Sequence, residues 1–137
     1  MLFRSSAPPL SHVTGGREKG AARSSGGRLD LRLSMPGGPG TGTNPELLLA
    51  AEWSACFASA MTLEACRMKT ALRNDLAITA VVGLNLGGDG YCLRARLNFS
   101  LPGIEPEIAR ALIDGAHQTC PYSTATLGNI EVAITLI

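Results

Sequence analysis

The clearest pattern along the chain is a long run of mostly apolar residues, 46–69, that contains no glycine or proline. Asn44 and Pro45 precede the run, and these residue types favour the N-cap and the first position of a helix. Arg67 and Lys69 suit a helix C-terminus, where positive charge interacts favourably with the helix dipole. The sequence therefore predicts a helix from Asn44 to about Lys69. Because the run is apolar on nearly every side, we expect this helix to be central and buried.

Apolar and polar residues alternate in several shorter segments, which is typical of half-buried strands. In residues 28–35 (RLDLRLSM) the leucines share one face and the charged residues share the other. Two further segments flank the turn-forming sequence Gly87-Gly88-Asp89-Gly90 and predict a hairpin. The glycine- and proline-rich residues 36–43 predict a loop. The predicted strands are residues 11–14 (at most a short one), 28–35, 76–86, 91–101 and 129–137.

A second amphipathic helix begins at Pro106, where apolar residues recur at helical spacing up to Ala116. Pro121 suits the first position of a short helix and leaves Cys120 near its N-cap. The order strand, strand, helix, strand, strand, helix, strand, with mostly antiparallel neighbours, predicts an α+β fold. At 137 residues the chain is most simply one domain, residues 1–137, of which residues 1–10 are expected to be poorly ordered.

Composition and charge narrow the class of protein. Only 4% of the residues are aromatic although 45% are hydrophobic, so we expect alanine, leucine, isoleucine and valine to build the core. A net charge of +1 gives no electrostatic reason to expect binding to nucleic acid or to a membrane. The apolar stretch in the N-terminal sequence MLFRSSAPPLSHV is too short for a secretory h-region, and no segment approaches the length of a membrane span. We therefore expect a cytoplasmic protein, in which a disulfide is usually catalytic or sensory.

Two of the four cysteines lie in informative segments. Cys56 lies within the predicted long helix and Cys120 at the start of a short one, so we expect a burial-favoured thiol and a more mobile one. A thiolate attacks a peroxide, and a second cysteine can condense with the resulting sulfenic acid to form a disulfide. Exposed backbone N–H groups at a helix start stabilise a thiolate. The residues alone leave open that Cys56 is a small core residue and Cys120 an incidental turn residue.

Two segments resemble the signature segments of the organic hydroperoxide resistance (Ohr) family, within the OsmC/Ohr superfamily: residues 42–60 (GTNPELLLAAEWSACFASA) and 117–132 (HQTCPYSTATLGNIEV). The sequences TGGREKG, RLDLRLSMP and LNFSLPGI extend the likeness over nearly the whole chain. The resemblance implies an OsmC-like fold, with mostly antiparallel sheets packed on two long helices in an intertwined homodimer. It also implies a thiol-dependent peroxidase that reduces organic hydroperoxides to alcohols. Cys56 would be the peroxidatic and Cys120 the resolving cysteine, and a lipoylated protein or dihydrolipoamide would reduce their disulfide.

The same resemblance implies roles for Arg17 in the GGR motif and Glu46 in the NPE motif, which family members use to hold the reactive thiolate. A guanidinium near sulfur favours the anion, and a carboxylate can orient the guanidinium through a bidentate pair. Without the resemblance, Arg17 would be a solvated loop residue and Glu46 a first-turn charge. On one helix, Glu46 and Cys56 are ten positions apart, a rise of about 15 Å and an offset of roughly 80°. Either the helix starts later than predicted or, as we favour, a second subunit supplies Arg17 and Glu46 to Cys56.

The chain departs from the family pattern at a few positions. Glu52-Trp53 replaces a usual Gly-Tyr, and Glu52, four residues before Cys56, would raise the thiol pKa if it pointed at the sulfur. Alternatively, the pair faces solvent, a groove rim or Arg17. Thr124 and Leu127 replace a common Asn and Arg, which makes the specificity harder to predict than the reaction.

The other apolar, cysteine and histidine residues do not change the predicted function. Trp53, Phe57, Met61 and Leu127 would suit an alkyl hydroperoxide or could be ordinary core. Cys66 and Cys92 are not expected to be catalytic. His117 and Cys120 lack a partner pair at zinc spacing, so we expect no metal and no cofactor. The alternative functions are a general OsmC-like peroxidase of broader peroxide specificity, a non-catalytic thiol redox sensor, and a scaffold with incidental thiols.

Overall fold

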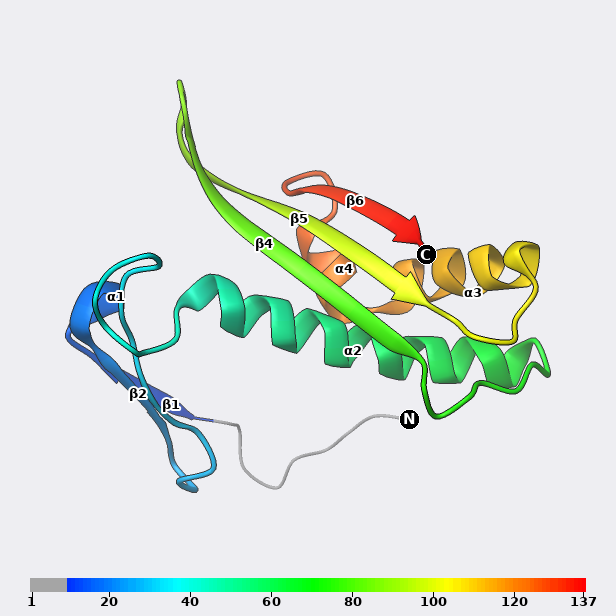
Figure 1. Ribbon diagram of the computed structural model, residues 1–137, viewed down its shortest axis with the longest axis horizontal. Coiled ribbons are helices and arrows are strands. Elements are labelled where there is room, and N and C mark those ends of the chain that lie inside the picture. The colour runs from blue at the N-terminus through cyan, green and yellow to red at the C-terminus, as the bar shows by residue number, and fades with distance from the viewer. Residues whose placement is uncertain (1–9) are drawn as a thin grey trace. The chain divides into compact units, whose positions relative to one another are not determined.

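The computed structural model describes residues 10–137, which fall into two compact units, one ending at Leu48 and one formed by Leu49–Ile137 (Figure 1). The predicted disorder of residues 1–10 therefore lies, except for Leu10, outside the described residues. The description of the chain as one domain stays a prediction. Both units contain strands and the chain contains helices, so the predicted α+β class is confirmed.

The described part of the first unit contains a three-stranded antiparallel sheet in the order β1-β2-β3. A single helical turn, α1 (Gly16–Lys19), lies between the first two strands. The start of the long helix α2 (Pro45–Arg67) also belongs to this unit. The strands are β1 (Ser11–Thr14), β2 (Ala21–Ser24) and β3 (Asp30–Arg32).

Two predictions for this sheet need correction. Residues 28–35 form a strand of only three residues, because the neighbouring β2 is itself four residues long and the pairing ends with it. The strand β2 was not predicted, because its sequence AARS has neither alternation nor β-branched residues. Its strand conformation comes from backbone pairing with β1 on one side and β3 on the other. The short strand predicted at residues 11–14 is confirmed.

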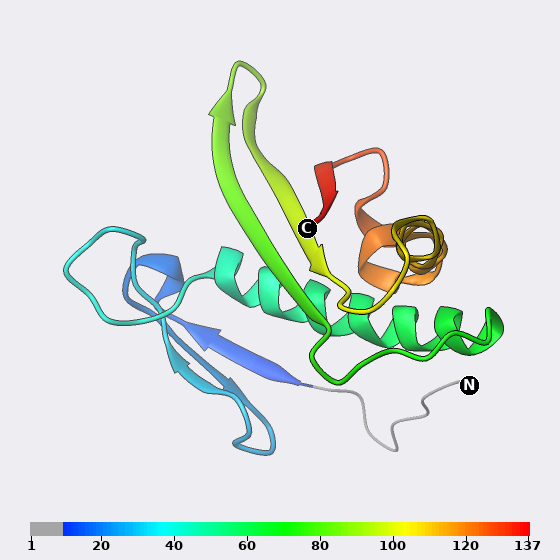
Figure 2. The ribbon, with the colours of Figure 1, turned by 45° about the vertical axis from the view of Figure 1, so that its right-hand side comes forward.

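The second unit contains a sheet in the order β4-β5-β6, made of β4 (Ala77–Gly87), β5 (Gly90–Ser100) and β6 (Glu131–Leu136). The first two strands form the predicted hairpin. Their pairing begins with Ala77 opposite Ser100 and ends with Gly87 opposite Gly90, at a projecting tip (Figure 2). The strand β6 runs parallel to β5. A parallel pair needs a crossover, and helices α3 (Pro106–Thr119) and α4 (Pro121–Thr126) provide it.

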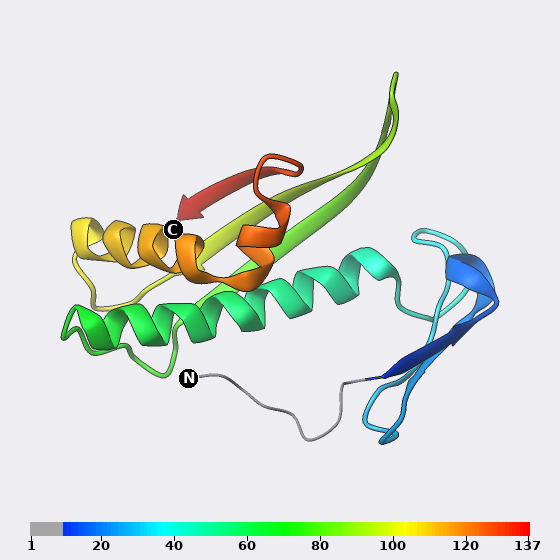
Figure 3. The ribbon, with the colours of Figure 1, turned by 180° about the vertical axis from the view of Figure 1, so that it is seen from behind.

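In the second unit, α3 and the α2 residues from Leu49 onward pack on the same face of this sheet (Figure 3). Alternation along β5 turns Leu97 and Phe99 into this core and leaves Arg94 and Arg96 exposed on the other face. The Phe99 ring lies 4.7 Å from that of Phe57 on α2. The largest fully buried side chains are Trp53, Phe57, Met61, Leu97, Phe99, Leu112, Cys120 and Ser123. Three aromatic residues, Trp53, Phe57 and Phe99, therefore fill the centre, and aliphatic residues surround them.

The helix α2 is not buried on all sides, contrary to prediction. Four residues at four-residue spacing form an exposed stripe: Ala51, Ala55, Ser59 and Leu63. The opposite side of the helix packs into the core through Trp53, Phe57 and Met61. The helix also ends at Arg67, two residues before the predicted end. None of the helices within residues 10–137 is long and apolar enough to cross a membrane.

Candidate active site

Two reduced cysteines meet in the second unit. The Cys120 thiol donates a hydrogen bond to Cys56 Sγ at 3.4 Å, although the residues are 64 positions apart in the chain. Cys56 lies within α2, and Cys120 lies at the corner where α3 ends and α4 begins. The Cys120 N–H donates to Ala116 O, and the Cys120 carbonyl accepts from Thr124 N, so the corner is fixed on both sides. The fold thus brings together the two thiols that the sequence singled out.

The burial of the two thiols is the reverse of the expected one. Cys120 is 0% exposed and belongs to the hydrophobic core, whereas Cys56 is half-buried. Sequence alone placed Cys120 correctly at a helix start but could not show that the α3–α4 corner folds over the core. The more accessible thiol is therefore Cys56, the one that the family resemblance assigns to peroxide attack.

The surroundings of Cys56 favour its protonated form. Burial of the thiol is the largest effect and raises its pKa, and the hydrogen bond with Cys120 raises the pKa further. The backbone N–H of Tyr122 acts in the opposite direction and lowers the pKa, because it stabilises a thiolate. No cation of the second unit is among the groups that shift this pKa. A positive charge near the sulfur would favour the thiolate.

The helices α2 and α4 are joined close to the two sulfurs. The Trp53 indole N–H donates a hydrogen bond to Ser123 Oγ at 3.0 Å, and both side chains are buried. Next to this bond, Glu52 interacts with Tyr122 and raises the pKa of the phenol, mainly by hydrogen bonding. Glu52 is not among the groups that shift the Cys56 pKa. Sequence reasoning missed the partners Tyr122 and Ser123, although both lie in the CPYS segment.

We predict that Glu52→Gln lowers the pKa of Tyr122 toward its ordinary value. The carboxylate raises that pKa mainly by hydrogen bonding to the neutral phenol and also because its charge disfavours the phenolate, and a neutral amide weakens both effects. The absorbance of tyrosinate during a pH titration measures the change. The chain has one other tyrosine, Tyr91, and a Tyr122→Phe variant gives the absorbance of Tyr91 alone.

The same Glu52→Gln variant should leave the Cys56 pKa unchanged, as measured by the pH dependence of thiol alkylation. A lower Cys56 pKa in this variant would show that the carboxylate does act on the sulfur.

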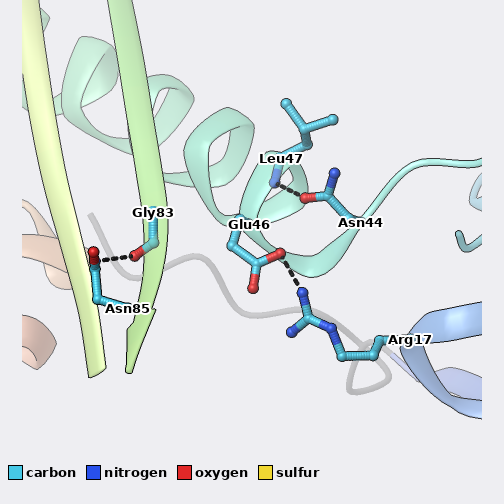
Figure 4. A network of polar contacts seen from close by, with 6 residues as sticks. All are labelled: Arg17, Asn44, Glu46, Leu47, Gly83 and Asn85. Atoms are coloured by element: carbon cyan, nitrogen blue, oxygen red, sulfur yellow. Dashed lines mark hydrogen bonds and ion pairs between the residues drawn. The ribbon is translucent and has the colours of Figure 1, made fainter. Parts of the chain in front are cut away.

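In the first unit, Arg17 Nη2 donates a hydrogen bond to Glu46 Oε2 at 2.8 Å (Figure 4). One such bond forms, rather than the expected bidentate pair. The Glu46 side chain is 10% exposed and that of Arg17 30%, so Arg17 is not the solvated residue of the simpler interpretation. Glu46 does lie in the first turn of α2, as that interpretation expected. Asn44 Oδ1 accepts a hydrogen bond from the Leu47 N–H at 2.9 Å, which fixes the start of α2 as an N-cap beside Glu46.

Glycines shape the turn that carries Arg17. Gly15 and Gly16 adopt φ values of 74° and 70°, in the left-handed region that glycine tolerates best. A Cβ atom at Gly20 would collide with the backbone carbonyl oxygens of Thr14 and Gly16. The sequence GGREKG therefore encodes a turn of fixed shape that holds the guanidinium beside Glu46.

We predict that Gly20→Ala destabilises the protein by about 1–3 kcal/mol, because the added methyl group meets backbone oxygens that cannot move aside cheaply. Urea unfolding measures the loss. Gly26→Ala is the matched control, since no atom lies within 4 Å of the added methyl group there. Equal stability of the two variants would contradict the close approach described for Gly20.

The other residues considered from the sequence lie in the core or on the surface. Trp53, Phe57 and Met61 are fully buried in the core, whereas Leu127 is exposed. Cys66 and Cys92 are exposed. His117 stacks on Phe57 with ring centroids 6.0 Å apart. Among residues 10–137, no group of three histidine, cysteine or acidic side chains is arranged to bind a metal ion.

The fold and the thiol pair define an α+β protein with a close dithiol, and comparisons identify its family. The family described as OsmC-like protein matches residues 38–135. An organic hydroperoxide resistance protein of Xanthomonas axonopodis pv. citri is 44% identical over 128 residues, which cover 90% of this chain and 89% of that protein.

Solved structures agree with this match. The organic hydroperoxide resistance protein OhrB of Bacillus subtilis superposes with a TM-score of 0.90 at 33% identity, covering 97% of this chain and 100% of that one. A protein of the same description from Legionella pneumophila gives a TM-score of 0.88 at 36% identity, covering 97% and 98%. The chain belongs to the organic hydroperoxide resistance family of OsmC-like proteins, as its two signature segments predicted.

Proposed function

We propose that the protein is a thiol-dependent peroxidase that reduces organic hydroperoxides to alcohols. Cys56 is the peroxidatic cysteine and Cys120 the resolving cysteine. The observation that carries the proposal is the 3.4 Å approach of their sulfur atoms. The relatives named organic hydroperoxide resistance proteins support the class of substrate.

The reaction proceeds in two steps. The Cys56 thiolate attacks the terminal peroxide oxygen, the O–O bond breaks, and the alkoxide takes a proton to leave as the alcohol. Cys56 is then a sulfenic acid. The Cys120 sulfur attacks the Cys56 sulfur, a disulfide forms, and the hydroxyl leaves as water. A disulfide is about 2.0 Å long, so the sulfurs need to move by little more than an ångström from their 3.4 Å separation.

A dithiol must return the disulfide to its reduced form. We take this reductant to be a lipoyl group, either on a lipoylated partner protein or as dihydrolipoamide, because its two thiols can complete the exchange through a mixed disulfide. We take the compartment to be the cytoplasm, where a disulfide is usually catalytic or sensory.

The proposal gives Arg17 and Glu46 the task of lowering the Cys56 pKa from a second copy of the chain. Burial and Cys120 raise that pKa, so a guanidinium near the sulfur is needed to generate the thiolate. Along α2, Glu46 and Cys56 are ten residues apart, about 15 Å, which is too far for one carboxylate–guanidinium pair to bridge. The exposed stripe of Ala51, Ala55, Ser59 and Leu63 offers a face for the second copy. The active unit is then a homodimer with composite sites.

The raised pKa of Cys56 also favours a second candidate, a redox sensor that forms the same disulfide slowly and without turnover. Turnover separates the candidates. The reduced protein is given an alkyl hydroperoxide or H2O2, with dihydrolipoamide or thioredoxin as reductant. Fast turnover of the alkyl hydroperoxide with dihydrolipoamide supports the proposed function. Equal rates with H2O2 would instead identify a general peroxidase, and oxidation that stops after one equivalent a sensor.

A further inference from the structure

A buried hydrogen bond between α2 and α4 lies beside the thiol pair. Trp53 is three residues before Cys56 on α2, and Ser123 is three residues after Cys120 at the start of α4. Three residues are close to one helical turn, so Trp53 is one turn from Cys56 along α2. The bond from Trp53 Nε1 to Ser123 Oγ, at 3.0 Å, thus joins the same two segments as the sulfur contact at 3.4 Å.

Burial makes this bond a strong geometric constraint. Trp53 is 0% and Ser123 2% exposed, so water cannot replace either partner when the bond breaks. The indole ring is held in the core between the helices and the sheet and cannot follow Ser123 if α4 moves. The helix α4 has six residues, too few to be stable by itself, and its position depends on such contacts.

Glu52, which precedes Trp53 in the chain, interacts with Tyr122, which precedes Ser123. The Trp53–Ser123 hydrogen bond and the Glu52 carboxylate beside Tyr122 thus lie at the same contact of α2 with α4. Cys120 begins that helix, and these contacts fix where its sulfur lies relative to Cys56.

We propose that Trp53 and Ser123 are positioning residues for the resolving step, because their hydrogen bond holds α4 where the Cys120 sulfur can reach the Cys56 sulfenic acid. The proposal rests on the proposed peroxidase function. It concerns formation of the disulfide and not the attack on peroxide, since neither Trp53 nor Ser123 hydrogen-bonds to Cys56.

The fate of the sulfenic acid makes this role measurable. In the productive reaction Cys120 attacks the Cys56 sulfur, and the sulfenic hydroxyl leaves as water. In the competing reaction a second hydroperoxide oxidises the sulfenic acid to a sulfinic acid and is itself reduced to the alcohol. Slower disulfide formation therefore increases the sulfinic acid formed at high hydroperoxide concentration, even when the rate of the first attack is unchanged.

The test uses Trp53→Phe, which keeps an aromatic ring without the N–H donor, and Ser123→Ala, which removes the acceptor. An alkyl hydroperoxide, cumene hydroperoxide, is mixed rapidly with the reduced full-length protein. Samples are quenched with an alkylating agent and with a sulfenic-acid trap, then analysed by mass spectrometry. Each variant should form the disulfide about tenfold more slowly, because the hydrogen bond that holds α4 beside α2 is lost. The rate of the first attack should stay within a factor of about two of wild type.

The double variant Trp53→Phe/Ser123→Ala provides the decisive comparison. If the two residues act through one hydrogen bond, the double variant is again about tenfold slower and not about a hundredfold slower. Ser54→Ala is the matched control, since its hydroxyl bonds only to the Ala50 carbonyl within α2. This control should form the disulfide at the wild-type rate.

Three results would overturn the proposal: an unchanged rate of disulfide formation, a rate of attack that falls equally, or an additive loss in the double variant. Unfolding curves establish that each variant is folded at the assay temperature. If the wild-type protein itself is not oxidised by the alkyl hydroperoxide, the proposed function fails and the proposal with it. If the wild type turns over and the variants match it, the positioning role alone fails.

Discussion

Cys56→Ser is expected to abolish reduction of organic hydroperoxides, with turnover lower by about three orders of magnitude or more. A hydroxyl at this position is not ionised at neutral pH and cannot replace the thiolate nucleophile. A coupled assay with dihydrolipoamide as reductant measures the loss. Substantial turnover in this variant would show that another group attacks the peroxide.

Cys120→Ser should behave differently from Cys56→Ser. It should consume one equivalent of hydroperoxide and stop as the sulfenic acid, which further hydroperoxide converts to the sulfinic acid. Cys66→Ser and Cys92→Ser are the matched controls, because both thiols are exposed and distinct from the Cys56–Cys120 contact. Both controls should keep the wild-type rate.

Arg17→Met is expected to raise the pKa of Cys56 and to slow the attack on hydroperoxide by about a hundredfold at neutral pH. Burial and Cys120 raise this pKa, and in the proposed composite site the guanidinium of Arg17 opposes them. The rate rises with pH through the Cys56 pKa, since the thiolate is the reactive form. The midpoint of the pH–rate profile should therefore move to higher pH in Arg17→Met. Arg23→Met is the control, because Arg23 pairs with the exposed Asp30.

Mixed dimers test whether Arg17 acts on its own chain or on its partner. Chains carrying Cys56→Ser and chains carrying Arg17→Met are each inactive alone. If sites are composite, a mixed dimer has one site with both Cys56 and Arg17, so an equal mixture after subunit exchange regains about a quarter of the wild-type activity. No recovery after demonstrated exchange would place Arg17 and Cys56 on the same chain.

The elements that the sequence predicted are those with a strong local pattern. The helix α2 has an N-cap, a proline at its first position and a run without glycine, and the hairpin β4–β5 has two alternating strands around a glycine-rich turn. The strand β2 carries no such pattern. It forms because two neighbours provide backbone partners, which a reading of local residues cannot detect.

The candidate site was predictable to a similar extent. Motifs singled out Cys56 and Cys120, and the fold brings their sulfurs together. The burial of Cys120 depends on how α3 and α4 meet over the core, and the bond between Trp53 and Ser123 joins residues 70 positions apart. Both depend on tertiary packing. Local sequence therefore identified the two thiols that lie together, but not the contacts that hold them in place.

The distance between the two thiols along the chain has a consequence during synthesis. The ribosome adds Cys56 64 residues before Cys120. At a synthesis rate of about 5–20 residues per second, roughly 3–13 s pass in which a nascent chain has the first thiol without the second. A hydroperoxide met in that interval would leave a sulfenic acid with no intramolecular partner. The nascent thiol also lacks the folded surroundings that make a cysteine reactive, so under the proposed function the chain gains its reactivity and its protection against over-oxidation in the same folding event.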